Sequence, residues 1–303
     1  MTEGRNRSRV LYSYLHDPPA VAGSLILLLF ILAALLAPRI TPQNPYDLAT
    51  LDLEHFLTPP IWMEGGQAPF LLGTDDQGRD IFSTIIYGCR TSLIVGFGVV
   101  LTAGSFGILI GLLAGYYGGW LDVVTMRLAD TVFSFSTTLL AFLLLGIFKH
   151  GGVGIVIVAI CIVDWVRYAR TMRGSVLEIK QEAYIMAAKA SGAGDVRLLL
   201  RHILPNAIPP VFVVVAVDLA VVIMLEATLS FLGVGVPLTQ PSLGMMIAIG
   251  KNYVYAGMWW MIVFPGAALV VLVVAINLFA DWLREELNPR IERHRLITLD
   301  EKS

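Results

Sequence analysis

Residues 178–206 read EIKQEAYIMAAKASGAGDVRLLLRHILPN and form the longest polar interval between two strongly apolar segments in the second half of the chain. We call these residues the docking loop. Its first part, about 176–190, predicts a short helix with one face of very small side chains. The residues of that face are Ala183, Ala187 and Ala190. Gly192 and Gly194 then end the helix.

The second part of the docking loop predicts another helix. Asp195 is expected to cap its N-terminus, and Pro205 is expected to end it because proline has no backbone N–H. A helix, a glycine turn and a second helix lie between two membrane spans, and a face of small side chains allows the backbone of another protein to approach closely. The loop is therefore predicted to be a docking surface.

These residues resemble the cytoplasmic coupling loop of the membrane subunits of binding-protein-dependent ABC importers. In that family Glu-Ala-Ala, three residues and a Gly sit in a cleft of the ATPase. Met186 stands where the family has its Glu, and Glu182 lies one turn earlier on the same face. The resemblance implies ATPase coupling by Glu182, Ala183, Met186, Ala187, Ala188, Gly192 and Asp195. The alternative is an ordinary cytoplasmic helical hairpin.

The composition places the chain in a lipid bilayer. Of 303 residues 56% are hydrophobic and 15% are charged, and the mean hydropathy is +0.75. The net charge of −2 indicates no nucleic-acid partner. Cys89 and Cys161 are far apart in the sequence, and the five histidines do not cluster, so neither a disulfide framework nor a metal site is indicated.

We expect an all-α integral membrane protein with six transmembrane helices. The expected spans are 20–37, 91–115, 123–147, 153–169, 207–232 and 259–282. The expected divisions are an N-terminal cytoplasmic tail with the first span (1–37), an extracytoplasmic segment (38–83), a permease core of five spans (84–283) with the coupling loop at 175–205, and a C-terminal cytoplasmic tail (284–303).

Three further strings resemble one branch of the same family, the dipeptide, oligopeptide and nickel permeases, in particular the subunit with an extra N-terminal span. They are LGTDDQGRDIFSTIIYGCRTSL (72–93), the Gly- and Pro-rich segment 226–253, and DWLREELNPR (281–290). The resemblance covers about residues 70–290 and implies the transmembrane-domain fold of type I ABC importers, with a cytoplasmic coupling helix.

Glycines and acids within the spans predict packing and polar contacts. Gly107, Gly111 and Gly115 repeat every four residues, a stripe that allows close helix packing. Some of the acids inside predicted spans lie away from the span ends, and a charge at the centre of a span costs about 2.5–3.5 kcal/mol and therefore needs a partner or water. They are Asp164, Asp218 and Glu226, and we place Asp218 and Glu226 on the bundle side. They are candidates for the translocation pathway, and a role in holding the spans together is the alternative.

The basic residues predict the orientation. With the N-terminus inside and six spans, 16 of the 21 Lys and Arg residues are cytoplasmic. Four are outside and Arg90 lies at the boundary; the four are Arg39, Arg79, Lys149 and Lys251. We therefore expect both termini in the cytoplasm. The resemblance implies that the spans lie in the cytoplasmic or inner membrane of a bacterium or archaeon.

No motif of enzyme chemistry is visible. Gly250-Lys251-Asn252 lacks the glycine spacing and hydroxyl of a nucleotide-binding P-loop. No cofactor is expected on this chain, and ATP and Mg²⁺ are expected on two partner ATPase subunits or domains. The resemblance also implies a second related permease subunit, in a heterodimer, and an extracytoplasmic solute-binding protein.

The resemblance implies di- or oligopeptides as the commonest cargo, with nickel, glutathione or another small solute as alternatives. Two other classes of protein stay open. An ion-coupled secondary transporter would use the acids as ion sites and would need no ATPase. A membrane assembly factor would use the glycine stripe and the docking loop only for protein contacts.

Overall fold

The computed structural model describes residues 12–46, 55–148, 152–237 and 239–287, and within these ranges the regular structure is helical apart from one isolated bridge between Thr74 and Asp80. The all-α prediction is confirmed. In chain order the elements are α2 (Pro18–Leu35), α3 (Ala37–Ile40), α4 (Ile81–Tyr117), α5 (Gly119–Phe133), α6 (Thr137–Ile147), α7 (Val153–Ile179), α8 (Ala183–Ala190), α9 (Asp195–Leu198), the π-helix η3 (Leu199–Ile203), α10 (Leu204–Phe231), α11 (Leu243–Gly250), the 3₁₀-helix η4 (Val254–Ala256) and α12 (Trp260–Glu286).

Four helices of the described chain are long and apolar enough to cross a membrane: α2, α4, the continuous helix Asp195–Phe231 and α12. The pair α5 and α6 makes a fifth span if the two are counted together. Helix α7 has 27 residues but carries Asp164, Arg167 and Arg170 in its first 18. Its crossing of the membrane, and with it the count of six spans, stays a prediction.

The expected span at 123–147 is broken in the structure, because α5 and α6 meet at an angle of 90°. Small hydroxyl residues cause the break. The Ser134 hydroxyl donates to the Thr131 carbonyl at 2.7 Å, and such side-chain bonds offer the backbone an alternative to continuing the helix. Helix α6 restarts after Ser136, which has extended backbone angles.

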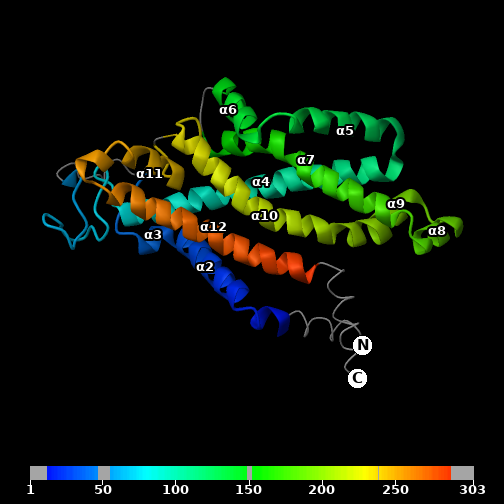
Figure 1. Ribbon diagram of the computed structural model, residues 1–303, viewed down its shortest axis with the longest axis horizontal. Coiled ribbons are helices and arrows are strands. Elements are labelled where there is room, and N and C mark those ends of the chain that lie inside the picture. Colours follow the sequence, from blue (N-terminus) through cyan, green and yellow to red (C-terminus); the bar gives the residue numbers. More distant parts are fainter. Residues whose placement is uncertain (1–11, 47–54, 149–151, 238, 288–303) are drawn as a thin grey trace.

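Helices α4 and α7 pack against each other along the glycine stripe (Figure 1). A Cβ at Gly107 would lie 2.5 Å from the carbonyl oxygen of Trp165, and one at Gly115 would lie 2.9 Å from Cβ of Val176. Any side chain at these positions would separate the helices. The prediction that the stripe serves packing is confirmed, and the contact fixes the central pair of the bundle.

Helix α5 is held on α7 by two ion pairs. Arg173 Nε lies 2.5 Å from Asp122 Oδ1, and Arg170 Nη2 lies 2.7 Å from Asp130 Oδ1. On the other side of the bundle, α2 packs against α12, where a Cβ at Gly23 would collide with the Ala275 carbonyl.

The long helices run lengthwise between two distinct ends (Figure 1). Helix α11 and the segment that follows α3 lie at one end, at the left of the view, and α8 and α9 lie at the other. We call these the α11 end and the α8 end. The docking loop and the 72–93 string therefore occupy opposite ends of the protein.

Candidate functional sites: the docking loop, the buried acids and the α11 end

The docking loop contains a short helix, α8, between two turns. The predicted single helix over 176–190 is wrong, since α7 ends at Ile179 and α8 begins at Ala183. Between them the N–H groups of Gln181 and Glu182 bond carbonyls only three residues back. The Lys180 ammonium donates a hydrogen bond to the Tyr116 carbonyl at 2.5 Å, and this bond anchors the turn to the end of α4.

The predicted glycine stop at Gly192 is confirmed. Its φ of +84° lies in the left-handed region that favours glycine. The N–H of Gly192 bonds the Lys189 carbonyl, and that of Ala193 bonds the Ala188 carbonyl, at 3.0 and 3.1 Å. This pair of bonds is a Schellman motif, which satisfies the last carbonyls of a helix and fixes the direction of the chain after it.

Helix α8 is exposed along almost its whole length. Ile185 is its only buried residue, with 3% of its surface accessible, whereas Tyr184 and Met186 expose 46% and 57%. Most of the predicted coupling residues are also exposed: Glu182, Ala183, Met186, Ala187, Gly192 and Asp195, with Ala188 half-buried. A rigid helix thus presents small and apolar side chains at one end of the bundle. The coupling role of these residues stays a prediction.

Asp195 does not cap a helix as predicted. Gly194 holds the N-cap position of α9 and Asp195 is its first residue. The carboxylate is engaged elsewhere, because Tyr116 Oη donates to Asp195 Oδ1 at 2.6 Å. Tyr116 therefore contacts the docking loop twice, through its hydroxyl to Asp195 and through its carbonyl to Lys180. We call these three residues the Tyr116 anchor.

Pro205 does not end the second helix, contrary to the prediction. Residues Asp195–Phe231 form one continuous helix of 37 residues that passes through Pro205, Pro209 and Pro210. The π-helical turn Leu199–Ile203 just before Pro205 is the reason. In a π turn each N–H bonds the carbonyl five residues earlier, so the turn is wider than in an α-helix. The wider turn relieves the usual clash between a proline ring and the carbonyl four residues before it. The docking loop is thus joined directly to α10.

Asp164 and Asp218 lie together around one arginine. Arg167 Nη1 donates to Asp218 Oδ1 at 2.5 Å, and its Nε lies 3.4 Å from Asp164 Oδ1. The Tyr168 hydroxyl donates to Asp218 Oδ2 at 2.6 Å. Both carboxylates are almost completely buried, while a third of the Arg167 side chain is accessible. The cluster joins α7 to α10, and its single cation partly neutralises two acids.

Glu226 forms a second polar cluster, away from the first. The hydroxyls of Ser92 and Ser230 donate to its two carboxylate oxygens at 2.8 and 2.7 Å. Glu226 is fully buried, so the expectation that it and Asp218 face the bundle is confirmed. The Ser92 contact links α10 to α4. The structure therefore separates the three predicted pathway acids into two clusters.

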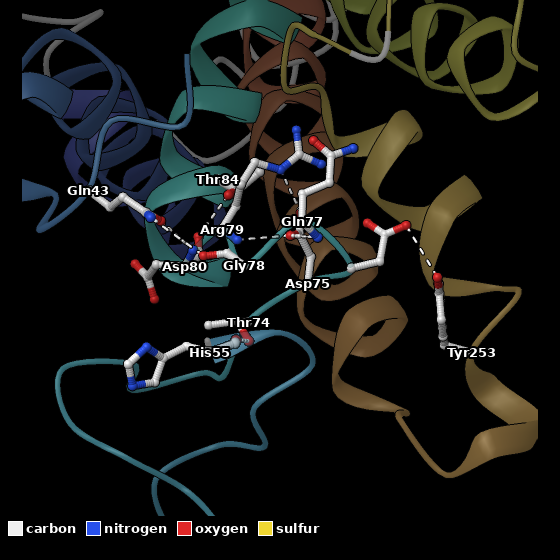
Figure 2. Close-up of polar contacts among 11 residues, drawn as sticks. Gln43, His55, Thr74, Asp75, Gln77, Gly78, Arg79, Asp80, Thr84 and Tyr253 are labelled. Carbon is white, nitrogen blue, oxygen red and sulfur yellow. Dashed lines mark hydrogen bonds and ion pairs between the residues drawn. The ribbon is translucent and has the colours of Figure 1, made fainter. Parts of the chain in front are cut away.

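At the α11 end, residues 73–80 form a compact loop stabilised by its own acids (Figure 2). Arg79 Nε lies 2.6 Å from Asp75 Oδ2, and both side chains are buried. Asp80 caps α4 by accepting the Ser83 N–H at 2.8 Å. Gln43 reaches the loop from the segment after α3, because its Oε1 accepts the Asp80 N–H at 2.6 Å. The Asp75–Arg79 ion pair and the bond from Asp80 to Gln43 therefore fix this loop at the start of α4.

Asp76 connects this loop to the segment after α11. Tyr253 Oη donates to Asp76 Oδ2 at 3.4 Å, whereas the buried Oδ1 has no hydrogen-bond partner among the described residues. Burial raises the pKa of Asp76 above its ordinary value, and the neighbouring Asp75 carboxylate raises it further. Burial also raises the pKa of Asp80, against the bonds from Ser83.

Sequence reasoning missed the residues that join distant parts of the chain. Tyr116, Tyr168 and Tyr253 each donate to a carboxylate at least 50 positions away. A polar aromatic residue at the end of a span or beside a buried acid is a weak signal for such a role. Within the described ranges, no group of three or more His, Cys, Asp or Glu side chains has the geometry of a metal site.

Two family models match the sequence. Residues 107–293 match the binding-protein-dependent transport system inner membrane component, and residues 7–60 match the N-terminal transmembrane domain of oligopeptide transport permease C. The chain belongs to the family of binding-protein-dependent transport system inner membrane components. The second match confirms the resemblance to the permease branch with an extra N-terminal span. ABC permeases of this family are transport subunits that work with ATPase and other membrane components.

Relatives of this permease cover nearly the whole chain. It is 38% identical to the di/tripeptide transport system permease protein DppC of Pseudomonas aeruginosa over 92% of this chain and 91% of the relative. It is 37% identical to the dipeptide transport system permease protein DppC of Haemophilus influenzae, over 90% of this chain and 91% of the relative. It is 36% identical to the glutathione transport system permease protein GsiD of Pectobacterium atrosepticum, over 92% of this chain and 89% of the relative.

Solved structures share the fold of this permease. An inward-facing form of the MetNI methionine ABC transporter superposes with a TM-score of 0.55 at 20% identity, over 68% of this chain and 96% of that one. An amino acid ABC transporter superposes with a TM-score of 0.52 at 16% identity, over 66% of this chain and 92% of that one. The expected importer fold is confirmed.

Proposed function

We propose that this permease forms half of the translocation pathway of an ATP-driven importer for di- and tripeptides. The support is the similarity to the named peptide permeases of Pseudomonas aeruginosa and Haemophilus influenzae, which spans nine-tenths of both chains in each case. The glutathione permease of Pectobacterium atrosepticum supports a second candidate cargo, because glutathione is itself a short peptide. Nickel and other small solutes are the remaining alternatives.

The docking loop is the proposed ATPase contact. One observation carries this assignment: α8 is exposed apart from the buried Ile185 and the half-buried Ala188, yet it is fixed at both ends, by Lys180 on one side and by Gly192 and Asp195 on the other. An exposed but rigid helix can receive force from a partner and pass it on. ATP and Mg²⁺ would bind to two partner ATPase subunits or domains, and none to this chain.

The α8 end would then be cytoplasmic, with both termini on that side, and the α11 end would face outward. This is the orientation that the distribution of Lys and Arg favours. A solute-binding protein would dock at the α11 end, and a second homologous permease subunit would complete the pathway as a heterodimer. The assembly would lie in the inner membrane of a bacterium or archaeon, without a nucleic-acid partner.

Two connections join the docking loop to the membrane helices and support an alternating-access mechanism. Movement of α8 passes through the turn at Gly192 into the helix Asp195–Phe231, which reaches the α11 end. The Tyr116 anchor passes the same movement into α4. ATP-driven closure of the ATPases would therefore shift α4 and α10 together, and the spans would rock so that a central cavity opens outward.

We assign Asp164, Asp218 and Glu226 to holding α4, α7 and α10 together, rather than to binding the solute. Each is buried, and the bonds from Arg167, Tyr168, Ser92 and Ser230 occupy most of their oxygens. A shared cation makes Asp164 and Asp218 poor ion sites, which weighs against a secondary transporter.

Reconstitution tests the proposal. The chain is purified with the permease, ATPase and binding protein encoded beside it, and ATP hydrolysis and uptake are measured over a panel of peptides that includes glutathione. Stimulation by binding protein loaded with a di- or tripeptide is the expected result. A chain that recruits no ATPase but moves solute down an ion gradient would overturn it.

A further inference from the structure

A cavity of about 680 Å³ opens at the α11 end, between the last turns of α6 and α10, the chain that follows α10, and α11. Most of the side chains that line it are apolar, Leu145, Phe231, Met245 and Ile249 among them. Its volume is within the usual range for small-molecule sites, about 300–1,000 Å³. Two polar side chains, Lys251 and Asn252, stand at its edge.

Lys251 is the cation of this cavity. It follows the last turn of α11, and its Nζ lies 4.7 Å from the centre of the Phe231 ring. No carboxylate of the described chain lies within ion-pair distance of it, and the Asn252 side chain has no hydrogen bond within the same ranges. The ring holds the ammonium in place while leaving its donors available.

The backbone around the cavity offers no further donors where the chain leaves α10. The N–H groups of residues 232–236 are all bonded, four to carbonyls at the end of α10 and the last, from Val236, to the Ser230 hydroxyl at 3.2 Å. An anionic group entering from this side would therefore depend on the side chains of Lys251 and Asn252.

We infer that this cavity receives the carboxyl-terminal end of the transported peptide, with the carboxylate on Lys251 and Asn252 and the last side chain against the apolar wall. The inference rests on the proposed peptide cargo and names the part of the cargo that this chain contacts. A lysine ammonium donates to a carboxylate without demanding a fixed geometry, and the aliphatic and aromatic wall accepts side chains of different shape.

The exposure of Lys251 suits a site on a transport route. An ion pair that stays in contact with water contributes little free energy, so the peptide is held weakly and can leave. The Asp76–Tyr253 contact links the segment just after Lys251 to the loop 73–80. A binding protein on that loop would therefore sit beside the entrance to the cavity.

Photo-crosslinking tests the inference. The complex of permease subunits, ATPases and binding protein is reconstituted, and the binding protein is loaded with a dipeptide whose C-terminal residue carries a benzophenone and a free carboxylate. Illumination during ATP hydrolysis is expected to crosslink residues of the cavity wall, Met245 and Ile249 first, as located by mass spectrometry. Lys251→Met should lower the yield by about twofold to fivefold, as expected for an exposed ion pair, and Lys251→Arg should retain most of it.

Arg39→Met is the matched control, because it removes an exposed cation near the same end without touching the cavity. Its crosslinking should equal that of the unaltered chain. Co-purification of all subunits confirms that each variant assembles, and Lys251→Gln provides a second neutral variant. Crosslinks outside the cavity, or equal yields with and without Lys251, would overturn the inference while peptide uptake continues. Absence of any peptide uptake by the unaltered complex would instead overturn the proposed cargo.

Discussion

The hydroxyl of Tyr116, on the last turn of α4, donates a 2.6 Å hydrogen bond to Asp195, the first residue of α9. Asp195 begins the long helix that contains α10, and Lys180 bonds the Tyr116 carbonyl from the other side of α8. One residue of α4 therefore contacts the docking loop on both sides of α8. If the docking loop moves, either these bonds break or α4 moves with it.

Tyr116→Phe should weaken the coupling of ATP hydrolysis to uptake while the chain still assembles. The variant removes one hydrogen bond to a carboxylate that is open to solvent, so we expect a loss of about 1 kcal/mol, or roughly fivefold fewer solute molecules moved per ATP. The measurement is the ratio of uptake to ATP hydrolysis in proteoliposomes. Tyr117→Phe is the control, since the Tyr117 hydroxyl makes no hydrogen bond within the described chain. An equal ratio in the two variants would remove the Tyr116 anchor from the mechanism.

Gly192→Val should abolish most ATP-driven uptake, whereas Gly192→Asn should retain most of it. A Cβ at Gly192 meets no atom within 4 Å, so the effect comes from the backbone alone. The left-handed conformation costs about 1–2 kcal/mol for most residues, more for a β-branched one, and Asn tolerates it best. Uptake and recovery of bound ATPase are measured for both. Normal uptake by the valine variant would show that the turn need not keep its conformation.

The sequence predicted the parts of this fold that depend on local pattern. Apolar runs located the four helices that are long and apolar enough to cross a membrane, repeated glycines marked the face of α4 that packs closely against another helix, and Gly192 marked the stop of α8. These features depend on neighbours within a few positions, where the chemistry of each residue decides the outcome.

The features that it missed depend on competition or on distance. Ser134 bends an apolar run because its hydroxyl competes for a backbone carbonyl, and Pro205 is tolerated because a π turn happens to precede it. Nothing near Tyr116 indicates Asp195, 79 positions away. Candidate acids were identified by their cost in a bilayer, but their partners become known only when the helices are placed.

Arg167→Leu should destabilise the complex, because it leaves Asp164 and Asp218 buried without their cation. Removing one member of a buried ion pair costs about 3–5 kcal/mol, and we expect the lower end because Arg167 is partly accessible. Thermal unfolding in detergent measures the loss. The variant that also carries Asp164→Asn and Asp218→Asn should recover most of it, because no unpaired charge then remains. A triple variant as unstable as Arg167→Leu would show that packing, rather than charge, decides the stability of this cluster.

Asp76→Asn should raise the melting temperature at pH 7.5, with a smaller gain as the pH falls. The pKa of Asp76 in the folded protein is raised above its ordinary value of 3.8, so the folded state binds the proton more tightly. The free energy of unfolding therefore falls as the pH rises from about 3.8 through the raised pKa, and stays lower above it. Asparagine removes the charge but still accepts a hydrogen bond from Tyr253. Glu64→Gln, an exposed acid of the same segment, is the control and should leave the melting temperature unchanged. A gain for Asp76→Asn that is equal at pH 7.5 and pH 4, or no gain at either, would show that the charge of Asp76 does not weaken this loop.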